Sequence, residues 1–533
     1  MVTVTIDGHE VQVAEGTNIV EAAGKAGIEV PTYCYHPGLS VVGQCRICFV
    51  EIEGQPRLVT ACSTPVADGM SVLTGSERVK EARAAVMEFL LENHPLDCPV
   101  CDQAGECYLQ DYSFEHGLDT THMVDERRTF PGFERRLIGP HVVQNQNRCI
   151  QCTRCVRFTQ EISETSDLTM KARGNHSYID TFNSEPYDNP WSACAADVCP
   201  VGALTVKEFR FRARVWHLEE TPSICPGCSI GCNISLGNLK GIVHRFVPRH
   251  NPEINGWWMC DYGRFLAEGL NDRDIEQPSR ADAQSEERAE MSWAEAIDEV
   301  ARLIATGSDV QAVVSANLPN EALLLAKKVL ADHLGARVLT PINDGEKHKI
   351  KNAQRQWIGS VDSHANSTGA RLIGLPTGDQ DALVKFLESS NGPLIVLDNR
   401  AHPWLATDAA AAALKGRPLI VLARTHTPLS RHAAVVLPLA SWAETEGTYT
   451  SSTGRVQLAQ RAFFPKAGAK PAAEALLLLG ARLEAGTDPN LTPRAMFEEL
   501  AAEVPAFAGM TYRRLAGEPG VPALGFEEVA HVG

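Results

Sequence analysis

The stretch "CPGCSIGC", residues 225–232, places three cysteines within eight residues, and Cys260 follows 28 residues after Cys232. It lies near the end of a cysteine-rich half of the chain. All sixteen cysteines fall between Cys34 and Cys260, and the last 273 residues contain none. In a reducing compartment, closely spaced thiols favour metal ligation over disulfides. What each group of cysteines binds therefore decides the fold of this half.

The overall composition is that of an acidic globular protein. The 533 residues carry a net charge of −17, which gives no attraction to nucleic acid or anionic lipid. No apolar run approaches the roughly 20 residues needed to span a bilayer. The N-terminus, "MVTVTIDGHEVQV", alternates around Asp7-Gly8 and predicts a β-hairpin rather than a signal peptide. We expect a cytoplasmic chain that reaches a membrane only through a partner.

The first group of cysteines follows this hairpin and a short helix, for which Thr17 is the expected N-cap and Gly27 lies near the end. A second hairpin around Glu53-Gly54 completes a β-grasp layout. The group has the spacing C-x10-C-x2-C-x13-C and consists of Cys34, Cys45, Cys48 and Cys62. Such thiolates can hold two bridged irons, with zinc as the alternative. The pattern resembles the plant-type [2Fe–2S] ferredoxin domain.

The second group begins with a histidine at the end of a predicted helix, residues 76–95. The expected buried face of that helix contains Val79, Val86, Phe89 and Leu90. The group has the spacing H-x3-C-x2-C-x5-C and consists of His94, Cys98, Cys101 and Cys107. A histidine at a helix end can also serve as a cation for the helix dipole. Three cysteines without a fourth favour ligation, and the motif resembles the one-histidine, three-cysteine [4Fe–4S] domain of complex I and related hydrogenases and formate dehydrogenases.

The third group combines the run "RCIQCTRC" with a distant Cys-Pro pair. It consists of Cys149, Cys152, Cys155 and Cys199. A C-x2-C-x2-C run holds three corners of a cubane cluster, and a cysteine before proline supplies the fourth ligand. Cys194 is left over and is expected to be a small buried apolar side chain. One run plus a distant Cys-Pro resembles the large iron–sulfur subunits of bacterial complex I, the NADH:quinone oxidoreductase.

The opening stretch supplies the fourth group, with zinc again as the alternative. It consists of Cys225, Cys228, Cys232 and Cys260. The module resembles the [4Fe–4S] domain of molybdopterin oxidoreductases. Catalytic members of that family carry a lysine where this chain has Tyr262, and no cysteine follows Cys260 to bind molybdenum. The resemblance therefore implies a retained cluster without the pterin cofactor.

The cysteine-free half alternates short apolar strands with helices, which predicts a parallel α/β layer. The strand runs include "GPLIVLD" (392–398) and "RPLIVLA" (417–423), and "SWAEAIDEVARLI" (292–304) is a helix capped by Ser292. Residues 433–460 resemble the segment that covers the pterin, where Thr448 and Arg455 are expected to be structural. Glu444 and Glu446 are expected in a solvated turn. No dinucleotide-binding, P-loop or zinc-protease motif is present.

The resemblance to the large iron–sulfur subunits of bacterial complex I implies a multidomain chain, α+β and then α/β. The expected divisions are a β-grasp [2Fe–2S] ferredoxin domain, a helical one-histidine domain, a bacterial-ferredoxin-like domain, a molybdopterin-oxidoreductase-type [4Fe–4S] domain and a shortened molybdopterin-oxidoreductase-like α/β region. Their expected boundaries are 1–78, 79–138, 139–216, 217–275 and 276–533.

The implied function is an electron relay in a proton-translocating NADH:quinone oxidoreductase, with no catalytic residue for an organic substrate on this chain. One [2Fe–2S] and three [4Fe–4S] clusters are implied, without molybdopterin, FMN or NAD. The implied partners are the flavin/NADH-binding subunit and other peripheral-arm subunits, at the inner face of the cell membrane. The alternatives are a molybdenum formate dehydrogenase alpha chain and the diaphorase-side relay of an NAD-linked hydrogenase.

Overall fold

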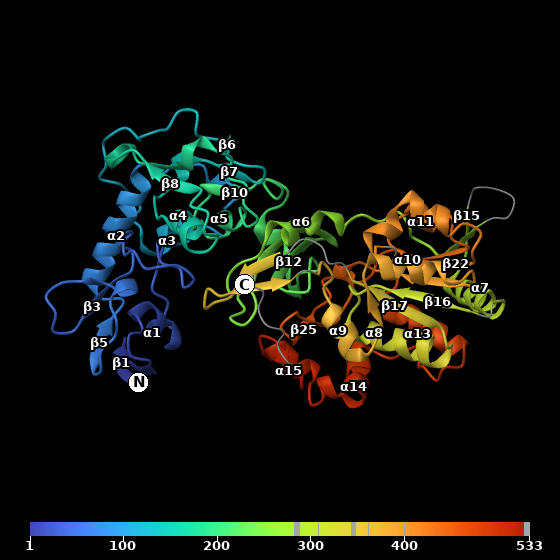
Figure 1. Ribbon diagram of the computed structural model, residues 1–533. Helices are drawn as coiled ribbons and strands as arrows, with labels where there is room; N and C mark the ends of the chain where they lie inside the picture. Colours follow the sequence, from blue (N-terminus) through green and yellow to red (C-terminus); the bar gives the residue numbers. More distant parts are fainter. Residues whose placement is uncertain (282–287, 308, 343–347, 361, 399, 527–533) are drawn as a thin grey trace. The chain divides into compact units, whose positions relative to one another are not determined.

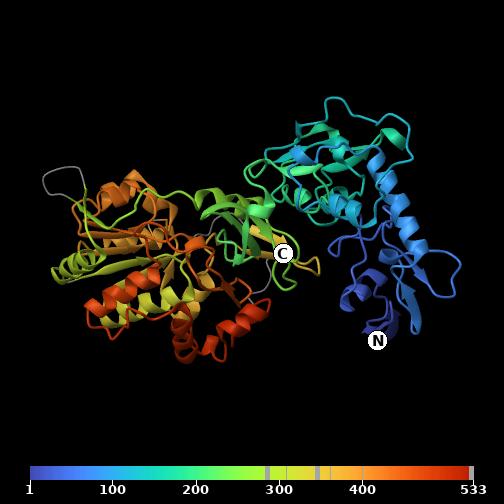
Figure 2. The same cartoon turned by 180° about the vertical axis from the view of Figure 1, so that it is seen from behind.

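The structure is a computed structural model that describes residues 1–281, 288–307, 309–342, 348–360, 362–398 and 400–526. The chain forms two compact units, Met1–Leu218 and Glu219–Gly533 (Figures 1 and 2). In the described part of the chain, no helix is long and apolar enough to cross a membrane.

The first unit begins with a five-stranded sheet in the order β2-β1-β5-β3-β4. Its elements are β1 (Val2–Ile6), β2 (His9–Val13), α1 (Ile19–Lys25), β3 (Phe49–Ile52), β4 (Val59–Thr60) and β5 (Met70–Leu73). β1 and β2 pair antiparallel, and Asp7 and Gly8 between them have positive φ, so the predicted hairpin is confirmed. The predicted N-cap of α1 is wrong by one residue. Asn18, not Thr17, caps the helix, because its amide oxygen reaches the Glu21 N–H at 2.9 Å.

The rest of the first unit is a set of short elements around the cysteine loops. They are α2 (Glu77–Glu92), α3 (Tyr108–His116), β6 (Arg136–Leu137), β7 (Val142–Gln144), α4 (Arg154–Glu161), β8 (Leu168–Lys171), β9 (Tyr178–Thr181), α5 (Cys194–Asp197) and β10 (Leu204–Val206). The predicted buried face of α2 is only partly right. Val79, Arg83 and Met87 are buried, whereas Phe89 is 67% exposed because it lies on the opposite side of the helix.

The second unit begins with a three-stranded antiparallel sheet that is followed by one helix. These elements are β11 (Glu219–Ile224), β12 (Asn233–Leu239), β13 (Ile242–Pro248) and α6 (Asp261–Gly269). Two smaller antiparallel sheets lie further along the chain. They are formed by β18 (His348–Lys351) with β19 (Trp357–Ser360), and by β24 (Gly447–Thr450), β25 (Arg455–Ala459) and β26 (Val521–Pro522).

An eight-stranded sheet forms the centre of the second unit, in the order β15-β14-β23-β22-β21-β16-β17-β20. The strands are β14 (Ser279–Ala281), β15 (Arg288–Glu290), β16 (Gln311–Val314), β17 (Arg337–Pro341), β20 (Thr377–Gly378), β21 (Leu394–Leu397), β22 (Leu419–Ala423) and β23 (Val435–Pro438). The six strands from β23 to β20 are parallel, which confirms the predicted parallel layer. From β16 the chain first adds β17 and β20 on one side, and then β21, β22 and β23 on the other.

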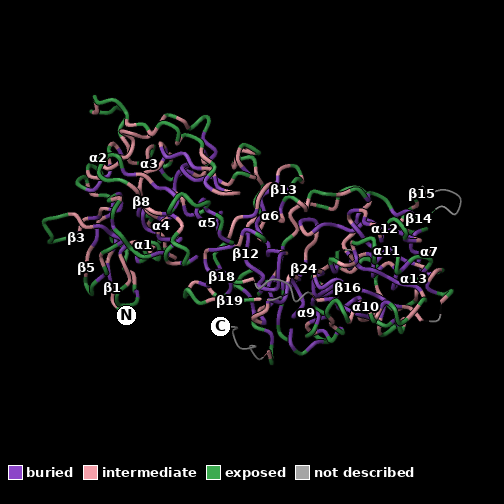
Figure 3. Tube along the Cα trace, turned by 45° about the horizontal axis from the view of Figure 1, so that its top comes forward, coloured by how far each residue is buried: buried purple, intermediate pink, exposed green. Residues whose placement is uncertain are grey.

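Helices cover both faces of this sheet. They are α7 (Trp293–Ala305), α8 (Asn320–Ala326), α9 (Ser367–Ile373), α10 (Gln380–Glu388), α11 (Asp408–Ala413), α12 (Pro428–Arg431) and α13 (Ala472–Arg482). Two further helices pack outside this layer: α14 (Pro493–Glu503) lies on α8 and β24, and α15 (Tyr512–Gly517) lies on β25. Val314 and Leu422 belong to the core on the face of α7, α8 and α13, whereas Val313 and Val421 belong to the core on the other face (Figures 1 and 3). The predicted capping box of α7, Ser292 with Glu295, is confirmed.

The expectation of a solvated turn at Glu444 is wrong. Glu444 is 1% exposed, pairs with Arg273 and accepts the N–H groups of Ser441 at 2.7 Å and Lys466 at 2.8 Å. The acidic residue closes a short 3-10 turn, Trp442–Glu444, and an arginine from a distant segment neutralises it. The sequence alone does not bring these segments together.

Replacing Glu444 with alanine removes a buried carboxylate and leaves Arg273, whose side chain is 11% exposed, without its partner. We expect Glu444→Ala to lower the free energy of unfolding by about 3–5 kcal/mol, measured from the urea midpoint of the full chain. The control is Glu299→Ala, which breaks a pair with Arg302 on the surface and should cost less than about 1 kcal/mol. Equal midpoints for the two variants would contradict this assignment.

Candidate metal centres

The first group of cysteines is gathered by the loop between α1 and β3 and by a 3-10 turn, Ala61–Ser63, after β4. The Sγ atoms of Cys48 and Cys62 lie 3.5 Å apart. The Cys34 N–H donates to Cys45 Sγ at 3.4 Å, and the Cys45 N–H donates to Cys34 Sγ at 3.5 Å. The hydrogen bond from Cys45, followed by one from Cys62, lowers the pKa of Cys34 to about 2. The structure thus brings all four thiols into one group.

The second group lies between the ends of α2 and α3. Cys98 is exposed, whereas Cys101 and Cys107 are buried. Burial raises the pKa of Cys107 to about 11, and Cys101 and Cys98 add to this shift, which places the three thiols near one another. Burial, followed by the charge of Arg148, lowers the pKa of His94 to about 4. The imidazole is therefore neutral at physiological pH, which is the form that binds a metal.

The third group encloses a small cavity that all four of its cysteines line together with apolar side chains. The loop "CIQCTRC" turns sharply here, since Gln151 and Thr153 both have positive φ. Burial raises the pKa values of Cys149 and Cys199 to about 12. Thiolates at these positions need a compensating positive charge, which iron supplies. The donor set and its enclosure therefore fit an iron–sulfur cluster.

The fourth group lies where β11 ends, β12 begins and α6 begins. The Cys225 N–H donates to Cys232 O at 2.8 Å, and Cys260 is the N-cap of α6, where its Sγ accepts the Gly263 N–H at 3.4 Å. A Cβ atom at Gly263 would lie 2.5 Å from Cys225 Sγ. Burial raises the pKa of Cys225 to about 12. Only glycine leaves room for this packing of backbone against sulfur.

Tyr262 and Cys194, for which the sequence predicts no ligand role, lie beside these groups. Tyr262 stacks on His348 with ring centroids 4.9 Å apart, and its ring lies against Gly227 in the cysteine loop. Cys194 is fully buried at the start of α5, as a small apolar side chain would be. Among the described residues, no three or more His, Cys, Asp or Glu side chains are placed to hold a single metal ion.

Two buried arginines of α4 were not found from the sequence. Arg157 donates to Cys34 O at 2.5 Å and to Cys152 O at 3.3 Å, so it joins the loops of the first and third groups. Arg154 donates to Tyr35 O and to Val198 O. A usable signal was present, because "RCVR" places both arginines on the helix that begins beside Cys155.

The second and third groups are also in direct contact. A Cβ atom at Gly202, which follows the Cys199-Pro200 pair, would overlap Cys101 Sγ. Gly202 has no side chain to displace this sulfur, so the backbone of one group packs on a thiol of the other.

The chain matches five protein families along its length. Residues 1–77 match "2Fe-2S iron-sulfur cluster binding domain", 83–122 match "NADH-ubiquinone oxidoreductase-G iron-sulfur binding region", and 139–205 match "NADH-quinone oxidoreductase subunit 3, ferredoxin-like domain". Residues 218–272 match "Molybdopterin oxidoreductase Fe4S4 domain", and 400–477 match "Molybdopterin oxidoreductase".

Among curated proteins, the 78 kDa subunit of mitochondrial NADH-ubiquinone oxidoreductase from Candida albicans is 40% identical over 346 residues, which are 64% of this chain and 47% of that protein. The G subunit of NADH-quinone oxidoreductase from Rickettsia bellii is 42% identical over 278 residues, 52% of this chain and 40% of that protein. The chain is a homologue of these NADH-quinone oxidoreductase subunits. It spans about half the length of the curated relatives it matches.

Among solved structures, a chain of an NAD+-reducing [NiFe]-hydrogenase in the H2-reduced state is 30% identical, with 40% of this chain and 91% of that chain covered and a TM-score of 0.37. Taken together, the family matches give the chain 2Fe–2S and 4Fe–4S binding domains and a molybdopterin-oxidoreductase-like C-terminal region.

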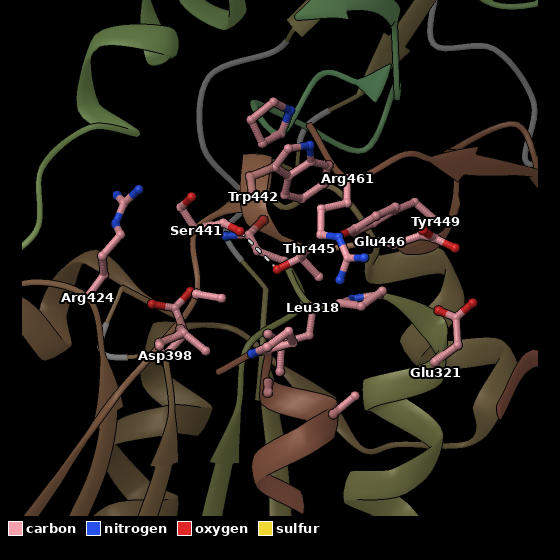
Figure 4. Close-up of a pocket in the computed structure, with 18 of the residues that line it drawn as sticks. Leu318, Glu321, Asp398, Arg424, Ser441, Trp442, Thr445, Glu446, Tyr449 and Arg461 are labelled. Atoms are coloured by element: carbon pink, nitrogen blue, oxygen red, sulfur yellow. Dashed lines mark hydrogen bonds between the residues drawn. The ribbon is translucent and has the colours of Figure 1, made fainter. Parts of the chain in front are cut away.

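That C-terminal match raises the question of a pterin cofactor. A cavity of about 390 Å³ lies in the second unit, between Tyr262 and the carboxyl ends of the parallel strands (Figure 4). Among the described residues that line it, none carries a thiol, and four carry carboxyl groups: Glu321, Asp398, Glu446 and Glu474. Arg400, Arg424 and Arg461 also line the cavity, so it carries charges of both signs. What the described lining lacks is a thiolate that could bind molybdenum.

Adding a methyl group at Gly202 tests the contact with Cys101. We expect Gly202→Ala to displace Cys101 Sγ and to lower the iron content of the anaerobically purified chain by up to about four atoms, one cubane core. Gly24→Ala is the matched control, because Gly24 lies in α1 and an added Cβ atom there would have nothing within 4 Å. Unchanged iron in the Gly202 variant would contradict the contact.

Proposed function

We propose that the chain is an iron–sulfur electron-relay subunit of a proton-translocating NADH:quinone oxidoreductase (complex I), carrying electrons from the NADH- and FMN-binding side toward quinone. The observation that carries the proposal is that fifteen cysteines fall into four groups, in which Cys98 is exposed and the other fourteen are buried or partly buried. These groups lie in the segments that match iron–sulfur domains. Its partners would be the flavin/NADH-binding subunit and other peripheral-arm subunits, at the inner face of the cell membrane.

We assign one cluster to each group. The proposed ligands are Cys34, Cys45, Cys48 and Cys62 for [2Fe–2S], and for the [4Fe–4S] clusters His94, Cys98, Cys101 and Cys107; Cys149, Cys152, Cys155 and Cys199; and Cys225, Cys228, Cys232 and Cys260. The proposed domains keep the boundaries expected from the sequence, with the β-grasp layout for residues 1–78. Cys194 is left without a ligand role.

When bound, iron–sulfur clusters supply one-electron redox centres. The chain's own residues hold them and set their environment. Backbone N–H groups donate to the sulfurs, as Gly263 does to Cys260 and Gln151 to Cys149 at 3.4 Å. Such hydrogen bonds withdraw electron density from sulfur and favour the reduced state, whereas burial in apolar surroundings opposes added negative charge. His94 contributes a neutral ligand in place of an anionic one.

The metal content of the chain separates this function from its rivals. With one [2Fe–2S] and three [4Fe–4S] clusters, we expect about 14 irons per anaerobically purified chain, without molybdenum or tungsten. Elemental analysis with electron paramagnetic resonance measures both. Stoichiometric molybdenum with formate oxidation would favour the formate dehydrogenase alternative. Stoichiometric zinc without iron would exclude an electron-relay function.

Replacing the proposed histidine ligand should shift one potential and leave the others unchanged. A thiolate at this position adds a negative charge to the cluster, so we expect His94→Cys to lower one reduction potential, on the order of 100 mV. Potentiometric titration followed by electron paramagnetic resonance measures the change. Cys194→Ala is the control, with all potentials and the iron content retained. If none of the reduction potentials changes in the His94→Cys variant, His94 is not a cluster ligand.

A further inference from the structure

The cavity in the second unit lies where ligands bind in open α/β sheets. The sheet reverses its order between β16 and β21, and ligands of such sheets bind outside the carboxyl ends of the strands at this reversal. Asn317 and Leu318 follow β16, Asp398 and Arg400 follow β21, and all four line the cavity. Its volume of about 390 Å³ falls within the range of roughly 300–1,000 Å³ that small-molecule sites occupy.

One wall of the cavity is aromatic. Trp442 and Tyr449 stack with ring centroids 4.2 Å apart, and both line the cavity. The indole Nε1 of Trp442 is buried and has no hydrogen-bond partner among the residues that the structure describes. Leu318, Leu439 and Met496 add apolar surface. A flat ring can pack against this wall, because aromatic faces favour offset stacking.

Arg461 places a cation in the same cavity. Figure 4 shows its guanidinium directed into the space beside Leu318, Thr445 and Glu446. The guanidinium carbon also lies over the ring of Phe464, 4.1 Å from the centroid. Within the described ranges, no hydrogen bond or ion pair engages this guanidinium. A half-buried arginine with open donors is a ready partner for a carboxylate, which it can bind through two parallel hydrogen bonds.

Apart from Glu446, the other charged side chains around the cavity interact with neighbouring groups. Asp398 lies beside Arg400 and Arg424, and burial raises its pKa. Burial also raises the pKa of Glu321 to about 7, where Tyr512 Oη and the Thr448 N–H donate to it. Lys470 pairs with Glu474 at 3.4 Å. Arg400 donates to Thr425 Oγ1 and Arg424 donates to Leu270 O. Among the described lining residues, Arg461 is thus the arginine whose guanidinium meets no hydrogen-bond acceptor, which leaves it open to the carboxylate of a ligand.

We propose that this cavity binds a flat aromatic monocarboxylate, with its ring against Trp442 and its carboxylate on Arg461. A dianionic phosphate fits less well, because Glu446 lies on the same side of the cavity (Figure 4). The site belongs to the second unit alone, and the proposal does not depend on the electron-relay function.

The test compares two probes of the same shape and different charge, 2-naphthoate and 2-naphthamide, by isothermal titration calorimetry on the full, cluster-loaded chain. We expect 2-naphthoate to bind with one-to-one stoichiometry and Arg461→Gln to weaken it about 10- to 100-fold, as for a lost hydrogen bond to a charged group. Binding of 2-naphthamide should be weaker and unchanged by the substitution. Arg461→Lys should recover part of the 2-naphthoate affinity, and Arg302→Gln, on the exposed face of α7, should alter neither probe.

Three results would overturn the proposal. The first is the absence of saturable 2-naphthoate binding to the unmodified chain. The second is an affinity for 2-naphthoate that Arg461→Gln leaves unchanged. The third is an equal loss of both probes in Arg461→Gln and Arg461→Lys while the thermal unfolding midpoint is retained, which would mean that the arginine shapes the cavity without recognising charge.

Discussion

Enclosing many thiols away from water is the constraint on which the first 260 residues depend. Burial raises the pKa of Cys149, Cys199 and Cys225 to about 12, so each thiolate needs a nearby positive charge. The loops that carry the thiols have little regular structure of their own. Short helices and strands hold the ends of these loops, and α3, α4 and α6 all begin next to a cysteine of one of the four groups. The thiols therefore determine where the elements start and stop.

Two arginines of α4 hold the cysteine loops of the first unit in place. Arg154 and Arg157 are buried, and their guanidinium groups donate to backbone carbonyls of the cysteine loops rather than to a carboxylate. A guanidinium has five N–H donors in a fixed plane, so one side chain can hold two loops in register. Its positive charge also lies near groups that carry negative charge as thiolates. The helix α4 thus links the first and third groups mechanically and electrostatically.

The sequence predicted the elements that local patterns specify. The Asp7-Gly8 hairpin, the capping box of Ser292 and the parallel strand runs all follow from turn chemistry, capping and periodicity. Errors arose where distant segments decide the outcome. Glu444 is buried because Arg273, 171 residues away, neutralises it, and Phe89 is exposed because the sheet packs on the other face of α2. The cysteine groups were visible as spacings, whereas the arginines of α4 and the open guanidinium of Arg461 depend on three-dimensional neighbours.

The contact between Gly202 and Cys101 couples the positions of the second and third groups. The backbone after Cys199-Pro200 lies on Cys101 Sγ with no room for a side chain between them. A movement of Cys101 therefore displaces the segment that follows Cys199, and a movement of that segment displaces Cys101. With clusters bound at both groups as proposed, damage to one cluster would disturb the ligands of the other.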